Sequence, residues 1–476
     1  MSISVTDAVA DAQDHVARRT LALTIALAVL GVFVTYVPIT SVSVALSTIR
    51  QGTGASTSDL QWVSDAYIIP MAAAILSAGV FGDLHGRRRV YVIGMALTAL
   101  GAVVAALAGT QEHGAALHVL WAGQAISGLG AGLLLPTTLA LIAHAVPDLH
   151  DRARFVALWA TGLVLGLAVG PLISGVILAH AAWGWIFVPV AGLAVAVGAI
   201  AWVRLPESKQ PEGRQLDWTG QGLATVAIAS SIFGVIEGGD TGWGSPQAVV
   251  ALALGAVALV AFVVAELRSP SPILEVRLFR SPAFSAAGFA ALVALFAIVG
   301  TTFLLSIFFG AGQHLAPLDI AYRLLFMNLV TAFVSPFAGR AMRVVPPVAV
   351  LAFGLALGAV AMLLLRGMGD TVGFGGAAWR LSVLGVADAF MLSAVAVAAI
   401  HAVPHRLAGM ASAANTALRQ YGGALGPAVL GVILTSRVTA GASMATAMHA
   451  GLLVNAIALA VAAGACAVSL RWAEAS

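Results

Sequence analysis

The sequence has very little charge for its length. Only 9% of its 476 residues are charged, whereas roughly 25% is usual for a soluble globular protein. Hydrophobic residues make up 60% of the chain. So few ionisable side chains cannot cover the surface of a soluble protein of this size. The composition therefore excludes a soluble enzyme, a disordered or fibrous chain and a nucleic-acid-binding protein, and it predicts a polytopic membrane protein.

Cysteine and lysine are almost absent. Cys466 is the single cysteine, which excludes an intramolecular disulfide and a cysteine-based zinc site. Lys209, the single lysine, lies in the string P-E-S-K-Q. An ATP-binding loop of the Walker type needs a lysine before serine or threonine in a glycine-rich loop. We therefore expect no ATP-driven motor, no metal site and no cofactor.

Fourteen long apolar runs follow the polar first twenty residues, and each has about the 20 residues that a membrane-spanning helix needs. They lie at roughly 21–46, 60–82, 89–109, 117–142, 153–179, 185–204, 217–237, 247–267, 283–309, 318–340, 347–366, 380–402, 407–435 and 447–470. The first run is too long for a secretory signal and lacks a cleavage context, so we expect it to remain as a span. The sequence predicts an all-α membrane protein with 14 transmembrane helices.

The distribution of Lys and Arg predicts the orientation of these spans. With the N-terminus inside, 17 of the 23 Lys and Arg residues lie at the cytoplasmic face, four at the outer face and two within spans. Cytoplasmic loops of membrane proteins are enriched in Lys and Arg, so both termini are predicted to be cytoplasmic. We expect a six-helix bundle at 1–204, a linker with two inserted helices at 205–276, and a second six-helix bundle at 277–476. The polar stretch 268–282 is interpreted as a helix on the inner surface.

The most specific string, G-V-F-G-D-L-H-G-R-R-R, starts at Gly79 at the cytoplasmic end of the second span. Gly79 allows a neighbouring helix to approach closely. Asp83 can accept hydrogen bonds from Arg87 or Arg88, and Gly86 permits a tight turn into the third span. The alternative interpretation is an ordinary positively charged inner loop that contains one aspartate.

A second string lies in the fifth span, where glycines recur every four residues. Gly162, Gly166 and Gly170 form a smooth helix face that Pro171 bends, and Gly175 follows. The alternative interpretation is a general packing seam between two helices.

These two strings resemble motifs of the major facilitator superfamily. The string at Gly79 is similar to motif A, which latches the cytoplasmic gate in that family, although Phe81 and Leu84 depart from its pattern. The glycine string resembles motif C, which marks exporters. Further phrases resemble the fourteen-helix drug/proton antiporter family from about residue 21 to 470: L-Q-W-V, W-x-W-I-F, L-D-W, G-W-G, L-F-R and N-T-x2-R-Q-x-G-G-x2-G.

The resemblance implies a major facilitator fold with a cavity between the two bundles and alternating access. It also implies export of amphiphilic drugs, antibiotics or secondary metabolites in exchange for protons. The expected partners are membrane lipid, a small amphiphilic substrate and protons, with no nucleic acid and no ATP. The expected location is the cytoplasmic membrane of a bacterium.

Two positions depart from the charges of that family. Pro38 stands where the family has an aspartate in the first span, and Gln124 stands where it has an arginine in the fourth. Asp65, in the second span at a similar depth to Pro38, is a candidate for the missing acid. The alternative is that Asp65 faces an outer vestibule and is hydrated.

Other polar residues lie deep in the C-terminal spans. Asp388 in the twelfth span is a candidate for proton or substrate coupling, with a structural hydrogen bond as the alternative. Arg419 in the thirteenth span is a candidate partner of Asp388 or a ligand for an anion, and Asn415 belongs to the same set. Asp319 and Arg323, four residues apart, are expected to form a salt bridge at a helix end.

The substrate cavity has several candidate residues. Tyr36, Pro38, Trp62, Tyr67 and Phe390 are candidates for its wall, with packing or interface anchoring as the alternative role. Two other functions remain open. A facilitator without proton exchange is favoured by the missing aspartate and arginine. A membrane-embedded enzyme is the second, but the sequence contains no paired catalytic carboxylates, nucleophile–base set or metal-ligand spacing to support it, so we expect no enzyme.

Overall fold

The computed structural model is nearly all helical and describes residues 5–111, 113–209, 216–404 and 407–475. The helices in these ranges are α1 Val5–Thr53, α2 Thr57–His85, α3 Arg87–Ala108, α4 His113–Ala145, α5 Leu149–Leu178, α6 Val188–Arg204, α7 Trp218–Asp240, α8 Pro246–Arg268, α9 Pro282–Ile307, α10 Pro317–Ala341, α11 Pro347–Leu365, α12 Phe374–His401, α13 Ala408–Thr439 and α14 Met444–Ala475. Fourteen segments within them are long and apolar enough to cross a membrane, which confirms the predicted spans.

Helix starts follow the local sequence. Ser56 caps α2 because its hydroxyl accepts a hydrogen bond from the amide of Asp59 at 3.1 Å, while the Asp59 carboxylate accepts one from the amide of Ser56 at 2.9 Å. The Ser281 hydroxyl caps α9 by accepting a hydrogen bond from the amide of Phe284 at 3.3 Å, and Pro282 follows at the first helical position, where the missing amide proton costs nothing. Three short segments are also helical: the 3-10 helices η1 Trp183–Phe187 and η2 Val276–Arg280, and the π-helix η3 Phe308–Gly312.

Two segments differ from expectation. The first helix begins at Val5, so the polar N-terminal segment continues the first span as helix. The segment 268–282 contains only one short 3-10 turn, η2, and no surface α-helix. Pro270 and Pro272 lack the amide protons that a continuous helix needs, and Glu266 at the end of α8 accepts a hydrogen bond from the amide of Leu274 at 2.9 Å. That bond holds the segment back against α8.

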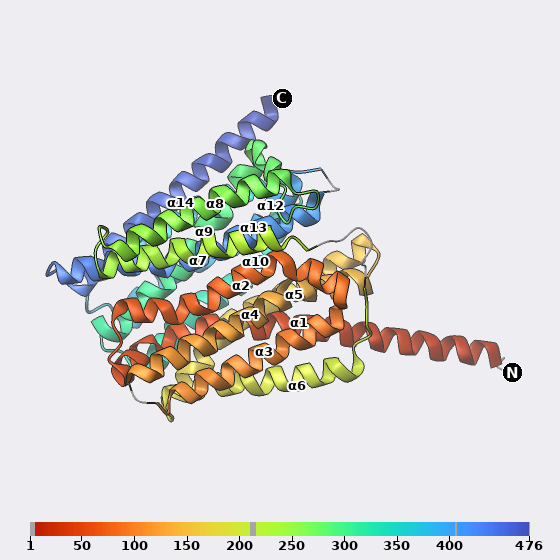
Figure 1. The fold of residues 1–476 in the computed structure, drawn as a ribbon, viewed down its shortest axis with the longest axis horizontal. Helices are drawn as coiled ribbons and strands as arrows, with labels where there is room; N and C mark the ends of the chain where they lie inside the picture. The colour runs from red at the N-terminus through yellow and green to blue at the C-terminus, as the bar shows by residue number, and fades with distance from the viewer. Residues whose placement is uncertain (1–4, 112, 210–215, 405–406, 476) are drawn as a thin grey trace.

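The helices pack as two sets of six with the α7–α8 pair beside them (Figure 1). Helices α1–α6 contact one another in the first set, and α9–α14 contact one another in the second. The main direct contacts between the sets are α2 with α13 and α5 with α10. The N-terminal end of the chain extends to the right in Figure 1, and the C-terminal end of α14 lies at the top. The boundaries of the two bundles at 204 and 277 remain a prediction.

Two close helix crossings repeat the same design in the two sets. In the first set, α5 crosses α1 so closely that a Cβ on Gly166 would lie 2.9 Å from the carbonyl oxygen of Phe33. In the second set, α13 crosses α9, and a Cβ on Gly426 would lie 2.5 Å from the carbonyl oxygen of Phe296. Glycine is required at both crossings because any side chain would collide with the backbone of the neighbouring helix.

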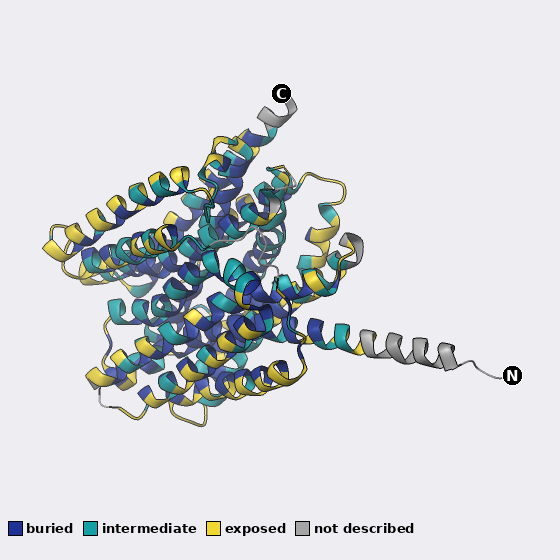
Figure 2. Ribbon diagram, turned by 45° about the vertical axis from the view of Figure 1, so that its right-hand side comes forward, coloured by how far each residue is buried: buried dark blue, intermediate teal, exposed yellow. Residues whose placement is uncertain are grey.

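The α7–α8 pair differs from the rest in its exposure (Figure 2). The most apolar window of α8 is only 28% buried, the lowest value among the fourteen spans, so α8 faces the lipid. Helix α7 lies against both sets. Gln221 donates a hydrogen bond to the Ala73 carbonyl of α2 at 2.7 Å, and Ser231 shares one with the Tyr421 hydroxyl of α13 at 2.9 Å. Helix α7 therefore bridges the line along which the two sets meet.

We predict that Gly166→Ala destabilises the fold by about 1–3 kcal/mol, because the added methyl group forces α5 away from α1. The measurement is the midpoint of thermal unfolding of the purified protein in detergent, which should fall by several degrees. Gly192→Ala in α6 is the matched control, since a Cβ there meets nothing within 4 Å. Its midpoint should stay the same or rise. Equal midpoints for the two variants would contradict the close crossing.

The orientation from the Lys and Arg distribution gives a second prediction. Gln111, in the turn between α3 and α4, and Lys209, after α6, are both exposed. With both termini inside, Gln111→Cys in intact cells reacts with a membrane-impermeant maleimide, and Lys209→Cys reacts only after the cells are permeabilised. The natural Cys466 is fully buried and serves as an unreactive background. The reverse labelling pattern would invert the predicted topology.

Candidate functional site

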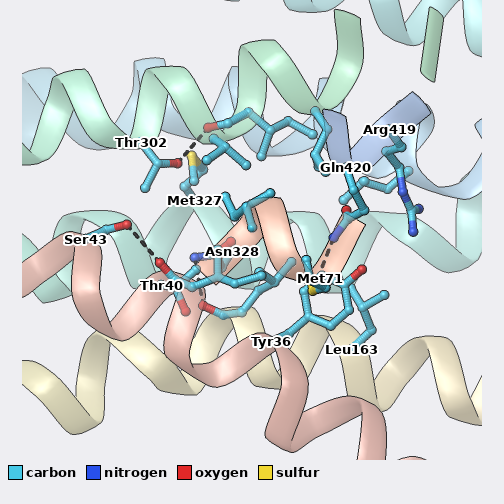
Figure 3. Close-up of a pocket in the computed structure, with 17 residues that line it drawn as sticks. Tyr36, Thr40, Ser43, Met71, Leu163, Thr302, Met327, Asn328, Arg419 and Gln420 are labelled. Atoms are coloured by element: carbon cyan, nitrogen blue, oxygen red, sulfur yellow. Dashed lines mark hydrogen bonds between the residues drawn. The ribbon is translucent and has the colours of Figure 1, made fainter. Parts of the chain in front are cut away.

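A cavity lies between the two sets of helices near the middle of the bundle (Figure 3). Helices α1, α2 and α5 of the first set and α9, α10, α12 and α13 of the second supply its walls. Most of its lining is aliphatic side chains and methionine. The polar side chains in the lining are Tyr36, Thr40, Ser43, Thr302, Asn328, Arg419 and Gln420. The cavity therefore suits an apolar body that carries a polar group.

Most of these polar groups already donate their hydrogen bonds within the protein. The hydroxyl groups of Thr40, Ser43 and Thr302 donate to carbonyl oxygens three or four residues earlier in their own helices, at 3.5, 3.1 and 2.8 Å. The Asn328 amide donates at 3.0 Å within α10 and at 3.2 Å to the Leu167 carbonyl of α5. These side chains therefore present mainly oxygen lone pairs to the cavity.

Arg419 is the single charged side chain that lines this cavity within the described chain. Its Nε is buried without a hydrogen-bond partner, and its guanidinium group forms no ion pair with a described residue. The pairing with Asp388 that the sequence allowed is not formed in this structure. Asn415 is buried with its amide 3.5 Å from the Val395 carbonyl and does not line the cavity.

Two buried carboxyl groups lie close to the cavity. Asp65 in α2 is fully buried, and neither of its carboxyl oxygens has a partner. Asp388 in α12 is 3% exposed, and its Oδ1 has no partner. Asp65 precedes Ile68 by three residues and Asp388 precedes Leu392 by four, and both of these aliphatic residues line the cavity. Each acid thus lies about one helical turn from the cavity. Asp65 is enclosed by protein here and does not face a hydrated vestibule.

The two sets meet on one side of the cavity. We call the face that carries the turn between α1 and α2 the outer face, following the predicted orientation. Toward this face, Gln61 of α2 donates a hydrogen bond to the Ala428 carbonyl of α13 at 3.3 Å. Near the end of α5 and the start of α10, a Cβ on Gly175 would lie 2.6 Å from the Cβ of Ala321. We call these two helix contacts the outer gate.

The outer gate is closed in this structure. Among the described residues, three hydrogen bonds join the two sets directly, and they run from Gln61, Asn328 and Gln420. The first lies in the outer gate, and the other two involve residues that line the cavity. Asp65 precedes Ile68 and Met71, the cavity-lining residues of α2, so along that helix it lies on the outer side of the cavity.

The string at Gly79 forms a compact turn at the inner end of α2. Arg87 donates to the Asp83 carboxylate at 2.8 Å and to the Ala140 carbonyl of α4 at 3.3 Å, so the aspartate ties α2 to the start of α3. Gly86 has a φ of 107°, which favours glycine and allows the turn that its position predicts. The expected close approach at Gly79 is absent, because a Cβ there would lie 3.9 Å from its nearest neighbour.

Glu207, in the linker after α6, completes this turn and was missed by the sequence reasoning. Its carboxylate accepts a hydrogen bond from the Arg88 amide at 3.1 Å and lies 3.8 and 3.7 Å from the side-chain nitrogens of Arg88 and Arg89. A Cβ on Gly86 would lie 2.5 Å from Glu207 Oε1. The negative charge thus sits at the N-terminus of α3, where the helix dipole favours it. A glutamate about 120 residues away in the chain gives no local signal for this contact.

The other predicted wall residues divide between two places. Tyr36 lines the main cavity, whereas Pro38, Tyr67 and Gln124 line a smaller cavity beside it. Trp62 and Phe390 line neither. Trp62 lies 5.9 Å from the Phe233 ring of α7, and Phe390 packs at 5.0 Å on the Phe353 ring of α11.

Arg323 does not form the expected salt bridge with Asp319. Its guanidinium group lies 5.0 Å from the Phe309 ring and 5.9 Å from the Phe374 ring, in cation–π geometry. Arg323 does not line the main cavity either. It therefore belongs to an aromatic cluster near the outer ends of α9, α10 and α12.

The sequence matches one protein family over most of its length. The family model described as Major Facilitator Superfamily covers residues 28–427. Multidrug resistance protein Stp of Mycobacterium tuberculosis is 32% identical over 427 residues, which is 89% of this chain and 77% of that protein. The methylenomycin A resistance protein of Bacillus subtilis is 30% identical over 436 residues, 88% of this chain and 89% of that protein. Drug efflux pump JefA of Mycobacterium tuberculosis is 30% identical, with 87% and 80% covered.

Solved structures support the same fold. A POT family transporter in complex with a thioalcohol-conjugated peptide superimposes with a TM-score of 0.70, covering 94% of each chain at 14% sequence identity. A second POT transporter, in complex with sulfate, gives a TM-score of 0.68 at 17% identity. At such low identity the likeness concerns the fold alone.

We predict that a disulfide across the outer gate locks the protein in this conformation. A Cβ on Gly431 would lie 3.0 Å from the Cγ of Gln61, and a cysteine sulfur at residue 61 occupies that Cγ position. The double variant Gln61→Cys, Gly431→Cys should cross-link on mild oxidation. Transport should then stop and return with reductant, while each single variant serves as the control. Full transport by the cross-linked protein would show that the outer gate does not open.

Proposed function

Because the chain belongs to the major facilitator superfamily, we propose that it exports amphiphilic drugs, antibiotics or secondary metabolites across the cytoplasmic membrane of a bacterium by alternating access. The protein is a multi-pass membrane protein with fourteen apolar spans. The observation that carries this proposal is the central cavity, which is mostly apolar and is closed toward the outer face. Such a cavity holds a substrate between the two sets until the outer gate opens.

The relatives support the direction of transport. Proteins that are 30–32% identical to this chain over most of their length include a multidrug resistance protein, an antibiotic resistance protein and a drug efflux pump. Export also agrees with the glycine string of α5, where Gly166 packs on α1. That seam keeps α1 and α5 together as one wall of the cavity while the two sets move. We propose no enzymatic activity for the protein, since its family is one of transporters.

We further propose that Asp65 exchanges the proton that drives export, with Asp388 as the second candidate. An ionised carboxylate without partners inside the membrane costs several kcal/mol, so a carboxyl group in this closed conformation is most stable with a proton. Opening of the outer gate separates α2 from α13 and hydrates the face of α2 that carries Gln61 and Asp65. Each cycle can then load a proton from outside and release it inside.

The turn at the inner end of α2 is proposed to act as the cytoplasmic latch. Asp83 and Arg87 join α2 to α3, and Glu207 fixes Arg88 and Arg89 at the start of α3. These contacts keep the turn rigid while the cavity opens and closes. Because Glu207 precedes α7 by only a short linker, the latch is also joined to the helix that bridges the two sets.

A proton-independent facilitator is the second candidate function. The observation that favours it is the cavity wall itself, since no aspartate or glutamate of the described chain lines it. Pro38 and Gln124, which replace the charged pair of the antiporter family, line the smaller cavity and not the main one. In this case substrate moves down its own electrochemical gradient.

The test is proton release from proteoliposomes that hold the purified protein. Addition of an exported compound should change the internal pH in the wild type, with lipophilic cations, neutral antibiotics and anions tested in turn. Asp65→Asn should reduce this proton flux at least about tenfold, because an amide cannot carry the proton. Substrate exchange at equal concentrations should persist, since that reaction needs no net proton movement.

Asp240→Asn is the matched control, because Asp240 is an exposed carboxylate at the outer end of α7. It should leave proton flux unchanged. Normal proton flux in Asp65→Asn would remove Asp65 from the mechanism, and Asp388→Asn then tests the second acid. Substrate movement without any pH change in the wild type would favour the facilitator.

A further inference from the structure

Arg419 is a cation in the middle of the bundle that forms no ion pair with any residue described by the structure. It lies eleven residues into α13, roughly 17 Å from the inner end of that helix. Its Nε is buried without a partner, and no carboxylate of the described chain lines the cavity with it. Figure 3 places it at one end of the cavity, away from Ser43 and Thr302. The residue is half-buried in the cavity wall, and its guanidinium group keeps its positive charge, so it attracts an anion that enters the cavity.

Two further hydrogen-bond donors line the same cavity. The hydroxyl of Tyr36 donates to no described residue. The Tyr36 side chain belongs to α1, and its Cβ packs closely on Gly166 of α5. The amide of Gln420 contacts only the sulfur of Met71 at 3.4 Å, a weak acceptor, and its Oε1 has no partner. Arginine, a phenol and an amide are a donor set that suits a carboxylate group.

The rest of the wall is apolar and neutral. Ile68, Met71, Leu163, Leu295 and Met327 contribute large hydrophobic side chains. A lipophilic cation would gain their apolar contact but would meet the charge of Arg419 without a carboxylate to offset it. An amphiphilic anion satisfies both parts of the cavity at once.

Building on the proposed function, we propose that Arg419 binds the anionic group of the substrate, so that the exported compounds are amphiphilic carboxylates. The carboxylate accepts from the guanidinium of Arg419, with the hydroxyl of Tyr36 as a further donor. The apolar body of the substrate lies against the aliphatic side of the cavity. Arg419 is then a residue that determines specificity by charge.

The test compares three fluorescent probes with the same apolar body: 4-(1-pyrenyl)butyrate, its methyl ester, and a pyrenylbutyl trimethylammonium cation. Binding to the purified full-length protein in lipid nanodiscs is followed by fluorescence anisotropy. The wild type should bind the carboxylate at least about tenfold more tightly than the ester or the cation, which is the size of a charge-assisted interaction. A wild type that prefers the cation, or makes no distinction, overturns the proposal without any variant.

Arg419→Gln should weaken binding of the carboxylate at least about tenfold and leave the ester unchanged. Arg419→Lys keeps the charge but loses the two-pronged geometry, so its loss should be smaller. Arg437→Gln, an exposed position near the outer end of the same helix, is the matched control and should bind all three probes as the wild type does. An equal loss for carboxylate and ester in Arg419→Gln would assign Arg419 a structural role and overturn the proposal.

This experiment separates the inference from the proposed function. Binding in nanodiscs needs neither a gradient nor a proton carrier. Carboxylate binding through Arg419 in a protein that exports none of the probes would leave the anion site standing and overturn export. Proton-coupled export of the cationic probe that is unaffected by Arg419→Gln would leave export standing and overturn the anion site.

Discussion

The cost of an unpaired ionisable group inside a membrane is the constraint on which this structure depends. Where charges are structural they are paired, as Asp83 and Arg87 are at the inner end of α2. Asp65, Asp388 and Arg419 have no ion-pair partner among the described residues. Arg323 has none either, but its guanidinium group lies over the Phe309 and Phe374 rings. The two acids can become neutral by binding a proton, but Arg419 cannot lose one. This difference in chemistry is why we propose different roles for them, proton carriers in one case and an anion ligand in the other.

The arrangement of the helices shows what must move and what must stay. The seams of α5 on α1 and of α13 on α9 are too close to separate without loss of packing, so each set moves as one body. The contacts of α2 with α13 and of α5 with α10 are the ones that must open. Helix α7 is tied to α2 through Gln221 and to α13 through Ser231. Movement of the sets must therefore exchange one of these bonds or carry α7 with it.

Much of the fold could be predicted from the sequence because membrane spans are read from long apolar runs, and the turn at Gly86 needs a residue that tolerates its φ of 107°. The residues of the site were harder to predict from the sequence. Arg419 and Tyr36 were found because a charge or an aromatic ring inside a span is conspicuous. Asn328 and Gln420 were missed because helical rotation decides which polar residue reaches a cavity. Glu207 was missed because its partners Arg88 and Arg89 are distant in the chain.

The charge of the substrate changes the energetics of both candidate functions. A membrane potential contributes about 2.3 kcal/mol for each elementary charge moved across 100 mV. Exchange of a cation for one proton moves no net charge, so only the pH gradient drives it. Export of an anion against one entering proton moves two charges in the favourable direction, which doubles the contribution of an inside-negative potential. Uniport of an anion still gains one such contribution, which corresponds to about a 50-fold ratio of its outside to its inside concentration. An anion bound at Arg419 would therefore be driven outward even without proton exchange, and loss of the charged pair at Pro38 and Gln124 need not abolish export.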